Sequence, residues 1–308
     1  MKKKQRIVFF GSPEFSLAPL KTLYLGGYEI VGVYTQEPKK KSRGMKEITT
    51  PVHQWAESQL LPVFTPVALN QESIHEFQSL KPDVAILFAY GKIIPKAWLD
   101  IPLYGFINIH ASLLPKWRGA APVQRSIENN DEITGISIMK MNEKLDEGPV
   151  LASQEIPITK ETNGLNLINQ MSLDSCSLLF NTLEKYFLGK IKLHDQDSSL
   201  SSYANKINKI ESKINWSEKA ATIERKIRAF YPYPAMWFDH EGKRYKVLKS
   251  KISNQIGKVG EIIDTPLIIA CGDQSLEVLE IQAEGKKAVS IDNFVLGNAN
   301  FKKNDFLR

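Results

Sequence analysis

The chain has 308 residues, is 43% hydrophobic and 24% charged, and carries a formal net charge of +6. These values are ordinary for a soluble globular protein, and the length favours two domains. Two cysteines exclude a disulfide framework or thiolate metal site, which suits a reducing cytoplasm. No apolar stretch approaches membrane length, and residues 7–10 are too short for a signal-peptide core, so we expect a cytoplasmic protein without a membrane partner.

The first half of the chain alternates predicted strands with predicted helices. The apolar run at residues 6–10 predicts a buried strand, and Ser12 is expected to cap a helix that ends near Leu25. Strands that are apolar throughout predict a Rossmann-like, doubly wound and mostly parallel α/β sheet covered on both faces. The turn at residues 11–15 lacks the G-x-G-x-x-G spacing, which argues against a dehydrogenase. Further strands are predicted at residues 28–34, 84–88, 106–110 and 134–141, and helices at 50–60, 70–80 and 165–187.

The character of the sequence changes after residue 190. Residues 193–202 are polar and lack apolar periodicity, which indicates a linker. A basic helix is expected at residues 217–230, followed by short strands separated by glycine and aspartate turns, the pattern of a small OB-like β-barrel. We therefore predict a catalytic domain at 1–190, a linker at 191–207 and a C-terminal domain at 208–308. The short strands are expected at residues 236–238, 245–248, 260–263, 267–270 and 276–281.

Basic residues are concentrated in the last third of the chain. From Lys206 to Arg308 there are 18 Lys and Arg against 13 Asp and Glu, so this third carries +5 of the total charge. A basic C-terminal domain on a nearly neutral body is typical of a protein that binds a polyanion. A plain solvated surface has the same composition, so this charge alone does not decide between the two.

Two polar residues end one of the predicted strands. Asn108 and His110 are two residues apart, so their side chains share one face of the strand. Ligands of a parallel sheet bind beyond the carboxyl ends of its strands, where the turn with Asp146 is also expected. An amide donor beside an imidazole that a carboxylate can orient suits acyl transfer. The alternatives are a core histidine with satisfied hydrogen bonds and an aspartate that only shapes its turn.

Other candidate chemistries are weaker. Ser112 lacks the G-x-S-x-G elbow of a hydrolase nucleophile. The remaining histidines have no ligand-like spacing with one another or with acids, so no metal site is predicted; they are His53, His75, His194 and His240.

The whole string that contains Asn108 and His110 resembles a family signature. Residues 108–125 read Asn-Ile-His-Ala-Ser-Leu-Leu-Pro-Lys-Trp-Arg-Gly-Ala-Ala-Pro-Val-Gln-Arg, which is similar to the folate-dependent formyltransferases. Within that family the resemblance is to the members that act on methionyl-tRNA, and it covers nearly the whole chain. Further matching segments lie at residues 11–15, 33–36, 89–95, 134–139, 145–148, 203–216, 227–234 and 285–290.

This resemblance implies transfer of a formyl group from 10-formyltetrahydrofolate to the α-amine of methionyl-initiator tRNA, without a metal and without a covalent enzyme intermediate. It assigns catalysis to Asn108, His110 and Asp146. It further implies binding of a tetrahydrofolate derivative, and we expect the protein to be a monomer. The folate pocket is assigned to Ser112, Leu113, Leu114 and Pro115, with Phe88, Ala89, Tyr90 and Gly91 beside the pterin.

One loop departs from the family pattern. After Gln36 the family carries a proline- and glycine-rich segment that engages the acceptor end of the tRNA, whereas this chain reads Glu-Pro-Lys-Lys-Lys-Ser-Arg-Gly. Arg43 and Gly44 remain, so the resemblance implies that the arginine's role carries over. The family segment's other proline and glycine are missing, so its stiffness is not carried over with the arginine. The expected tRNA contacts are Arg43, Lys39, Lys40, Lys41, Lys206 and Lys209. The lysine run also has a simpler interpretation as a solvated loop.

Three alternatives remain. A sugar-nucleotide N-formyltransferase shares the Asn/His/Asp set, but the segment at residues 120–125 resembles the tRNA branch. A glycinamide ribonucleotide formyltransferase is disfavoured, because that enzyme lacks the second domain that this chain is predicted to have. A non-catalytic RNA-binding protein on the same fold is disfavoured by the intact set of three polar residues.

Overall fold

The computed structural model describes residues 4–41, 46–296 and 301–307. The chain forms two compact units, each described here by itself. The first unit comprises residues 1–119, 133–157 and 168–203, and the second comprises residues 120–132, 158–167 and 204–308. The domain boundaries predicted from the sequence, at residues 190 and 208, remain a prediction.

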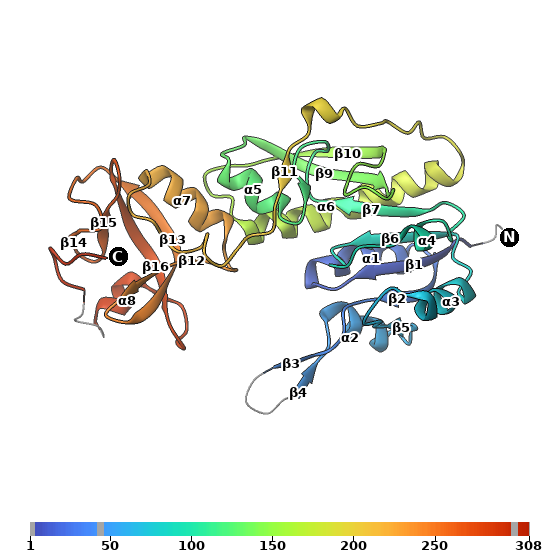
Figure 1. Ribbon diagram of the computed structural model, residues 1–308, viewed down its shortest axis with the longest axis horizontal. Coiled ribbons are helices and arrows are strands. Elements are labelled where there is room, and N and C mark those ends of the chain that lie inside the picture. Colours follow the sequence, from blue (N-terminus) through green and yellow to red (C-terminus); the bar gives the residue numbers. More distant parts are fainter. Residues whose placement is uncertain (1–3, 42–45, 297–300, 308) are drawn as a thin grey trace. The chain divides into compact units, whose positions relative to one another are not determined.

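The first unit is built on a seven-stranded sheet (Figure 1). Its strand order is β10-β9-β7-β6-β1-β2-β5. Five neighbouring strands run parallel to one another, and they are β7, β6, β1, β2 and β5. β9 is antiparallel to both β7 and β10. The mostly parallel sheet predicted from the sequence is confirmed. The strands are β1 (Arg6–Gly11), β2 (Glu29–Tyr34), β5 (Val63–Phe64), β6 (Val84–Phe88), β7 (Phe106–His110), β9 (Ile133–Lys140) and β10 (Val150–Pro157).

Helices cover the sheet close to where the sequence predicted them. Thr50 and Asn70 each cap a helix by accepting backbone N–H bonds with the side chain. The expectation that Ser12 is a helix cap is wrong, because a 3-10 turn, η1 (Glu14–Ser16), precedes the helix. The Ser12 hydroxyl instead accepts from the Gln36 N–H at 3.1 Å. The helices are α1 (Leu17–Leu25), α2 (Pro51–Ser58), α3 (Gln71–Ser79), α4 (Lys96–Leu99) and α6 (Gly164–Phe187).

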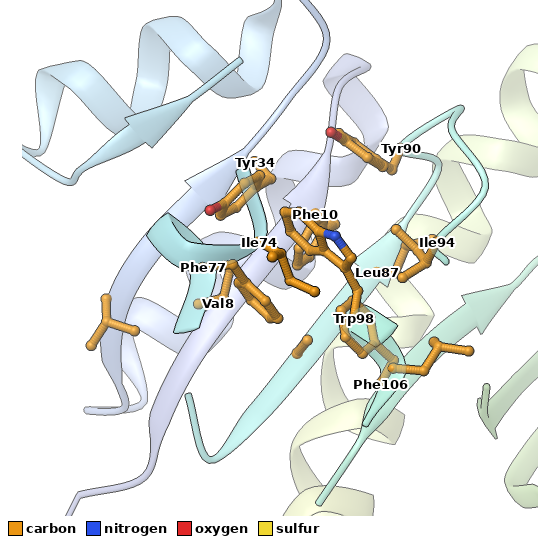
Figure 2. Packing of buried hydrophobic residues seen from close by; sticks show 13 residues of the cluster. Val8, Phe10, Tyr34, Ile74, Phe77, Leu87, Tyr90, Ile94, Trp98 and Phe106 are labelled. Carbon is orange, nitrogen blue, oxygen red and sulfur yellow. The ribbon is translucent and has the colours of Figure 1, made fainter. Parts of the chain in front are cut away.

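An aromatic cluster fills one face of this sheet (Figure 2). Phe10 of β1 stacks on Tyr34 with ring centroids 4.7 Å apart, and Phe77 of α3 stacks on Trp98 of α4 at 4.8 Å. Stacked ring pairs contribute to stability beyond the apolar area that they bury. Phe106 of β7 joins the same cluster, so the strand that carries Asn108 and His110 is fixed to the core at its first residue.

The second unit is built on an antiparallel sheet of strand order β12-β13-β16-β15-β14, with β17 paired to β16. The predicted short strands are confirmed, while closure of the sheet into a barrel stays a prediction. The elements are β12 (Met236–His240), β13 (Lys243–Ser253), β14 (Ile262–Asp264), β15 (Ile268–Ala270), β16 (Ser275–Ala283), β17 (Val289–Ser290), α5 (Pro122–Glu128), α7 (Ala220–Ala229) and α8 (Ile291–Leu296).

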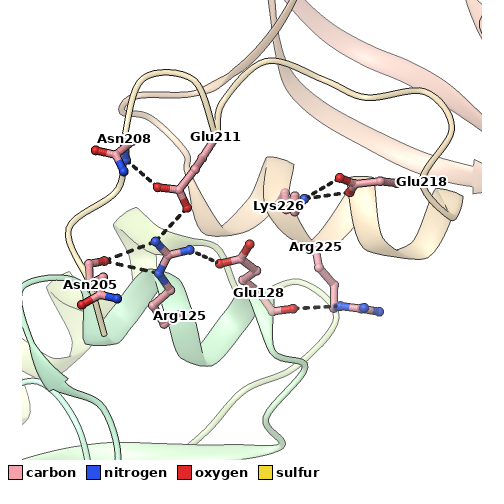
Figure 3. A network of polar contacts seen from close by, with 8 residues as sticks. All are labelled: Arg125, Glu128, Asn205, Asn208, Glu211, Glu218, Arg225 and Lys226. Carbon is pink, nitrogen blue, oxygen red and sulfur yellow. Dashed lines mark hydrogen bonds and ion pairs between the residues drawn. The ribbon is translucent and has the colours of Figure 1, made fainter. Parts of the chain in front are cut away.

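Polar contacts bind α5 to the rest of the second unit (Figure 3). The Arg125 guanidinium contacts Glu128 at 2.7 Å and Glu211 at 2.8 Å. Burial alone would lower its pKa, but the hydrogen bonds to these two carboxylates outweigh burial and raise it. Arg225 of α7 donates to the Glu128 carbonyl oxygen at 3.2 Å. These contacts explain why a helix within the predicted first domain packs with C-terminal residues.

Short strand pairs and a second 3-10 turn complete the described elements. They are β3 (Lys39–Lys41) with β4 (Lys46–Ile48), β8 (Arg118–Gly119) with β11 (Tyr203–Ala204), and η2 (Ser198–Leu200). None of the helices in the described part of the chain is long and apolar enough to cross a membrane.

Candidate active site

Asn108 and His110 lie at the carboxyl end of β7, as the sequence predicts. Leu87 of β6 lies beside Asn108, and Ser137 of β9 lies beside His110. Asn108 is 7% exposed and His110 is 5% exposed, so both polar side chains are largely withdrawn from water. Buried polar groups need partners, and both find one on the turn that follows β9.

That partner is Asp146, so the structure brings the three predicted catalytic residues together. One carboxylate oxygen of Asp146 lies 3.5 Å from the Asn108 amide nitrogen, and the other lies 3.7 Å from Nδ1 of His110. The Gly119 N–H donates to the same carboxylate at 2.8 Å. The carboxylate is therefore fixed by a backbone bond, while its longer contacts leave Asn108 and His110 able to exchange partners.

The backbone at this turn has a conformation that few residues adopt. Asp146 has φ of +52°, and a non-glycine residue in that region is uncommon outside constrained sites. Gly148 approaches β9 so closely that a Cβ there would lie 1.8 Å from the Lys140 carbonyl oxygen. Only glycine allows this approach, which brings the turn down beside the strand.

Both ring nitrogens of His110 face an oxygen. Nε2 lies 2.9 Å from the Trp117 carbonyl oxygen, which requires an N–H on that nitrogen. Nδ1, on the other side of the ring, lies 3.7 Å from an oxygen of the Asp146 carboxylate. Trp117, like Asp146, has a left-handed backbone conformation, with φ of +60°. The carbonyl that faces the ring therefore belongs to a residue in a conformation that few residues adopt. The sequence did not indicate this contact, because a backbone carbonyl has no residue signature.

The predicted folate residues 112–115 form a corner immediately after β7. The Ser112 hydroxyl donates to the Lys116 carbonyl at 2.6 Å, so it braces the corner and is not a free nucleophile. The Ser137 hydroxyl donates to the Ser112 carbonyl at 2.8 Å and accepts from the Leu114 N–H at 3.0 Å. Leu113, Leu114 and Pro115 are partly exposed, so the corner presents apolar surface.

The second set of predicted folate residues, 88–91, follows β6, the strand next to β7. Ala89 is exposed with φ of +53°, and Gly91 is exposed with φ of +82°. The Tyr90 side chain is fully buried in the aromatic cluster, and burial raises the pKa of its phenol. Only the backbone and small side chains of this segment are therefore available to a ligand.

The residues predicted to contact tRNA lie on separate parts of the chain. Arg43 lies outside the described residues, and Lys39 is exposed at the start of β3. Lys40 and Lys41 follow it in the same strand, so the lysine run begins a hairpin with β4 and is not an irregular loop. Lys206 and Lys209 are exposed in the second unit.

The second unit also contains a basic cavity that the sequence did not indicate. It has a volume of about 620 Å³ and is lined by parts of α7, β13, β16 and residues 160–163. Its cations are Lys160, Arg225, Arg228, Lys249 and Lys251, and its acids are Glu161, Glu224 and Glu280. Arg228 pairs with Glu224 at 2.7 Å and Lys251 pairs with Glu277 at 2.9 Å. The lining then leaves Lys160, Arg225 and Lys249 beside Glu161 and Glu280, which is a small excess of positive charge.

A metal site was not predicted for this chain. In the described ranges, no three His, Cys, Asp or Glu residues are grouped so that they could hold an ion.

Known proteins resemble this chain over nearly its whole length. A family model described as formyl transferase matches residues 5–181, and one described as formyl transferase, C-terminal domain, matches residues 206–299. A methionyl-tRNA formyltransferase from Pelagibacter ubique is 43% identical over 301 residues, covering 97% of each chain. The enzyme of that name from Parvibaculum lavamentivorans is 40% identical and covers 96% of this chain and 97% of its own.

Solved structures share the fold at much lower identity. HypX from Aquifex aeolicus in complex with tetrahydrofolic acid is 16% identical with a TM-score of 0.66, over 99% of this chain and 51% of that one. An N-formyltransferase from Helicobacter canadensis, with folinic acid and dTDP-3-aminofucose, is 18% identical with a TM-score of 0.67. That match covers 90% of this chain and 99% of the other. At these identities the likeness concerns the fold alone.

Proposed function

The chain belongs to the formyl transferase family, and we propose that it moves a formyl group from 10-formyltetrahydrofolate to the α-amine of methionyl-initiator tRNA. The product is the N-formylmethionyl-tRNA used to start translation. The observation that carries the proposal is the convergence of Asn108, His110 and Asp146 at the end of β7. It occurs in a chain that is 43% identical to a methionyl-tRNA formyltransferase. We place the reaction in the cytoplasm and assign it to a monomer.

Asn108 is the proposed oxyanion donor. Attack of the amine on the formyl carbon gives a tetrahedral carbon whose oxygen carries negative charge, and a fixed N–H donor stabilises that charge most in a water-poor site. Asn108 is 7% exposed, and within the described residues its amide nitrogen has one hydrogen-bond contact, at 3.5 Å to Asp146. A donor held this weakly can turn to the developing oxyanion at little cost.

His110 and Asp146 are proposed to manage charge and protons. In its doubly protonated form the imidazole donates from Nδ1 towards Asp146 and from Nε2 towards the Trp117 carbonyl oxygen. When the N–H at Nε2 leaves the Trp117 carbonyl oxygen and turns to the oxyanion, the charged His110 ring becomes the second hydrogen-bond donor to that oxyanion, beside Asn108. Asp146 then assists transfer of the amine proton to the departing folate nitrogen, directly or through water. The formyl group passes directly from the folate to the amine, so no covalent enzyme intermediate forms.

The folate is proposed to lie against the two segments that flank the site. The apolar corner at residues 112–115 and the backbone of residues 88–91 suit a flat aromatic ring with polar edges. The match to the formyl transferase family model supports a folate-derived donor, and two solved structures of the same fold were crystallised with tetrahydrofolic acid and folinic acid.

Formylation assays with a panel of acceptors test the proposed function. The purified enzyme and 10-formyltetrahydrofolate are given methionyl-initiator tRNA, uncharged initiator tRNA, an amino-sugar nucleotide or glycinamide ribonucleotide. We expect formyl transfer only to the charged tRNA. Transfer to the sugar nucleotide at a comparable rate would instead support the sugar N-formyltransferase alternative. Binding of tRNA without transfer would support a non-catalytic RNA-binding protein.

The exposed lysines of the second unit are proposed to hold tRNA phosphates without reading bases. Neutralising each phosphate releases counterions, so log Kd should rise steeply with log salt. The Lys206→Ala/Lys209→Ala double variant should weaken tRNA binding and lower that slope by roughly one for each phosphate that is no longer neutralised. Lys190→Ala, an exposed lysine of the first unit, is the control. An unchanged slope in the double variant would make these lysines ordinary solvated charge.

Arg43 is proposed to discriminate between tRNAs, whereas Lys39, Lys40 and Lys41 supply general attraction. A guanidinium fork can fix one geometry, but an ammonium acts as a point charge. Arg43→Ala should therefore slow formylation of the initiator substrate much more than it weakens binding, and the triple lysine-to-alanine variant should do the reverse. Kinetics on initiator and elongator methionyl-tRNA measure the difference. An equal loss on both substrates with Arg43→Ala would place discrimination elsewhere.

A further inference from the structure

We infer that Gln196 is a positioning residue for Asp146, an assignment that rests on the proposed function of that carboxylate. The Gln196 side-chain amide donates to the carbonyl oxygens of Asp146 at 2.8 Å and of Gly148 at 2.7 Å. Its carbonyl oxygen accepts from Nε of Arg118 at 3.0 Å. One side chain therefore contacts both the turn that carries Asp146 and the strand that follows the active-site corner.

The turn depends on contacts of this kind because it has little packing of its own. Leu145 is 62% exposed, and most of residues 142–145 face solvent. Asp146 holds φ of +52°, a conformation that persists only when surrounding interactions fix it. The two bonds from Gln196 attach to carbonyls on either side of Glu147. They therefore fix the path of the backbone at the point where the carboxylate projects towards His110.

Arg118 connects Gln196 to the opposite side of the same turn. It is 1% exposed, and its Nη1 lies 3.4 Å from the Glu147 carboxylate. The next residue, Gly119, donates its N–H to the Asp146 carboxylate at 2.8 Å. A buried guanidinium needs acceptors, and Gln196 supplies one while its own donors hold the turn. Among the common side chains only an amide can accept from arginine and donate to two carbonyls at once.

Gln196 is itself held in place by its neighbours. His194 and Val150 exchange two backbone hydrogen bonds, at 2.8 and 3.0 Å, and so attach this part of the predicted linker beside β10. One residue after Gln196, the Asp197 side chain accepts from the Ser199 hydroxyl and N–H, which lowers the pKa of that carboxyl. The amide is thus anchored on both sides along the chain, as a positioning group should be.

Three variants separate positioning from simple anchoring. Gln196→Ala removes all three hydrogen bonds. Gln196→Glu keeps an acceptor for Arg118, but its second carboxylate oxygen cannot donate to the carbonyls of Asp146 and Gly148. We expect both to lower kcat for formylation on the order of 100-fold, the cost of misplacing a catalytic group by about 1 Å. KM for 10-formyltetrahydrofolate and the melting temperature should change little. Gln170→Ala, which removes an exposed glutamine on α6, is the control and should match wild type.

A double-mutant cycle with Asp146→Ala shows whether Gln196 acts through that residue. We expect Gln196→Ala to cost less than about threefold in the Asp146→Ala background, because the carboxylate to be positioned is gone. An equal cost in both backgrounds would overturn the inference, as would a Gln196→Glu variant with near wild-type kcat. A loss of kcat that follows a large fall in melting temperature would mean a merely structural role. If Asp146→Ala alone is fully active, the proposed catalytic role of Asp146 fails, which is a separate outcome.

Discussion

Replacement of His110 by alanine is expected to lower kcat for formylation of methionyl-initiator tRNA by at least about 1,000-fold. This magnitude combines the loss of a proton-transfer group with the loss of a charged donor to the oxyanion. His110 is 5% exposed at the end of β7, so its removal leaves the Asp146 carboxylate without the ring that it faces. The folding of the first unit should survive, because the aromatic cluster does not include this side chain.

The measurement is a steady-state formylation assay with tetrahydrofolate binding determined in parallel. KM for the donor and the affinity for tetrahydrofolate should stay within about threefold of wild type, since the lost interactions belong to the transition state. His75→Ala, on the exposed side of α3, serves as the matched control. A His110→Ala enzyme with kcat within about threefold of wild type would remove His110 from the mechanism.

Replacement of Asp146 by asparagine is expected to lower kcat by roughly 100- to 10,000-fold, the range for loss of a group that directs acid–base chemistry. The amide oxygen can still accept the Gly119 N–H bond that Asp146 accepts at 2.8 Å, so the turn should keep its shape. The negative charge 3.7 Å from Nδ1 of His110 would be lost. The variant therefore isolates the charge of this carboxylate from its structural contact.

Crystal structures and pre-steady-state rates of the Asp146→Asn enzyme check this result. We expect a site superimposable on the wild type with a slow transfer step. Asp100→Asn, an exposed aspartate after α4, is the control for the same chemical change. A displaced turn together with slow transfer would assign the effect to structure, and an unchanged rate would show that the charge is not required.

The sequence predicted the sheet of the first unit well where strands are buried along their whole length. Residues 84–88 and 106–110 form β6 and β7 as predicted, because every residue in both is buried. β10 was not predicted, since it is an edge strand whose exposed and buried residues do not form a continuous apolar run. The Ser12 cap was wrong because a hydroxyl beside a proline suits both a helix cap and the loop contact that it makes with Gln36.

The site was predictable to the extent that it depends on side chains of one strand. Period-2 spacing places Asn108 and His110 together, and the turn after a neighbouring strand places Asp146 at the same edge of the sheet, although it is 36 residues further along the chain than His110. The resemblance to a family then assigned all three to catalysis. Trp117 and Gly119 act through backbone atoms, which leave no trace in residue type. Gln196 lies in a polar segment interpreted as a linker, and only the folded chain brings it to the turn of Asp146.

A single-turnover experiment with 10-formyltetrahydrofolate labelled in its formyl carbon tests the central claim most directly. The enzyme is mixed with limiting labelled donor and excess methionyl-initiator tRNA, quenched at intervals, and the label is followed in folate, protein and tRNA. Direct transfer at the Asn108, His110 and Asp146 site predicts that label passes from folate to the methionine amine with none on the protein. It also predicts no release of formate when methionyl-tRNA is omitted. Label bound to the protein, or donor hydrolysis without the acceptor, would contradict the account.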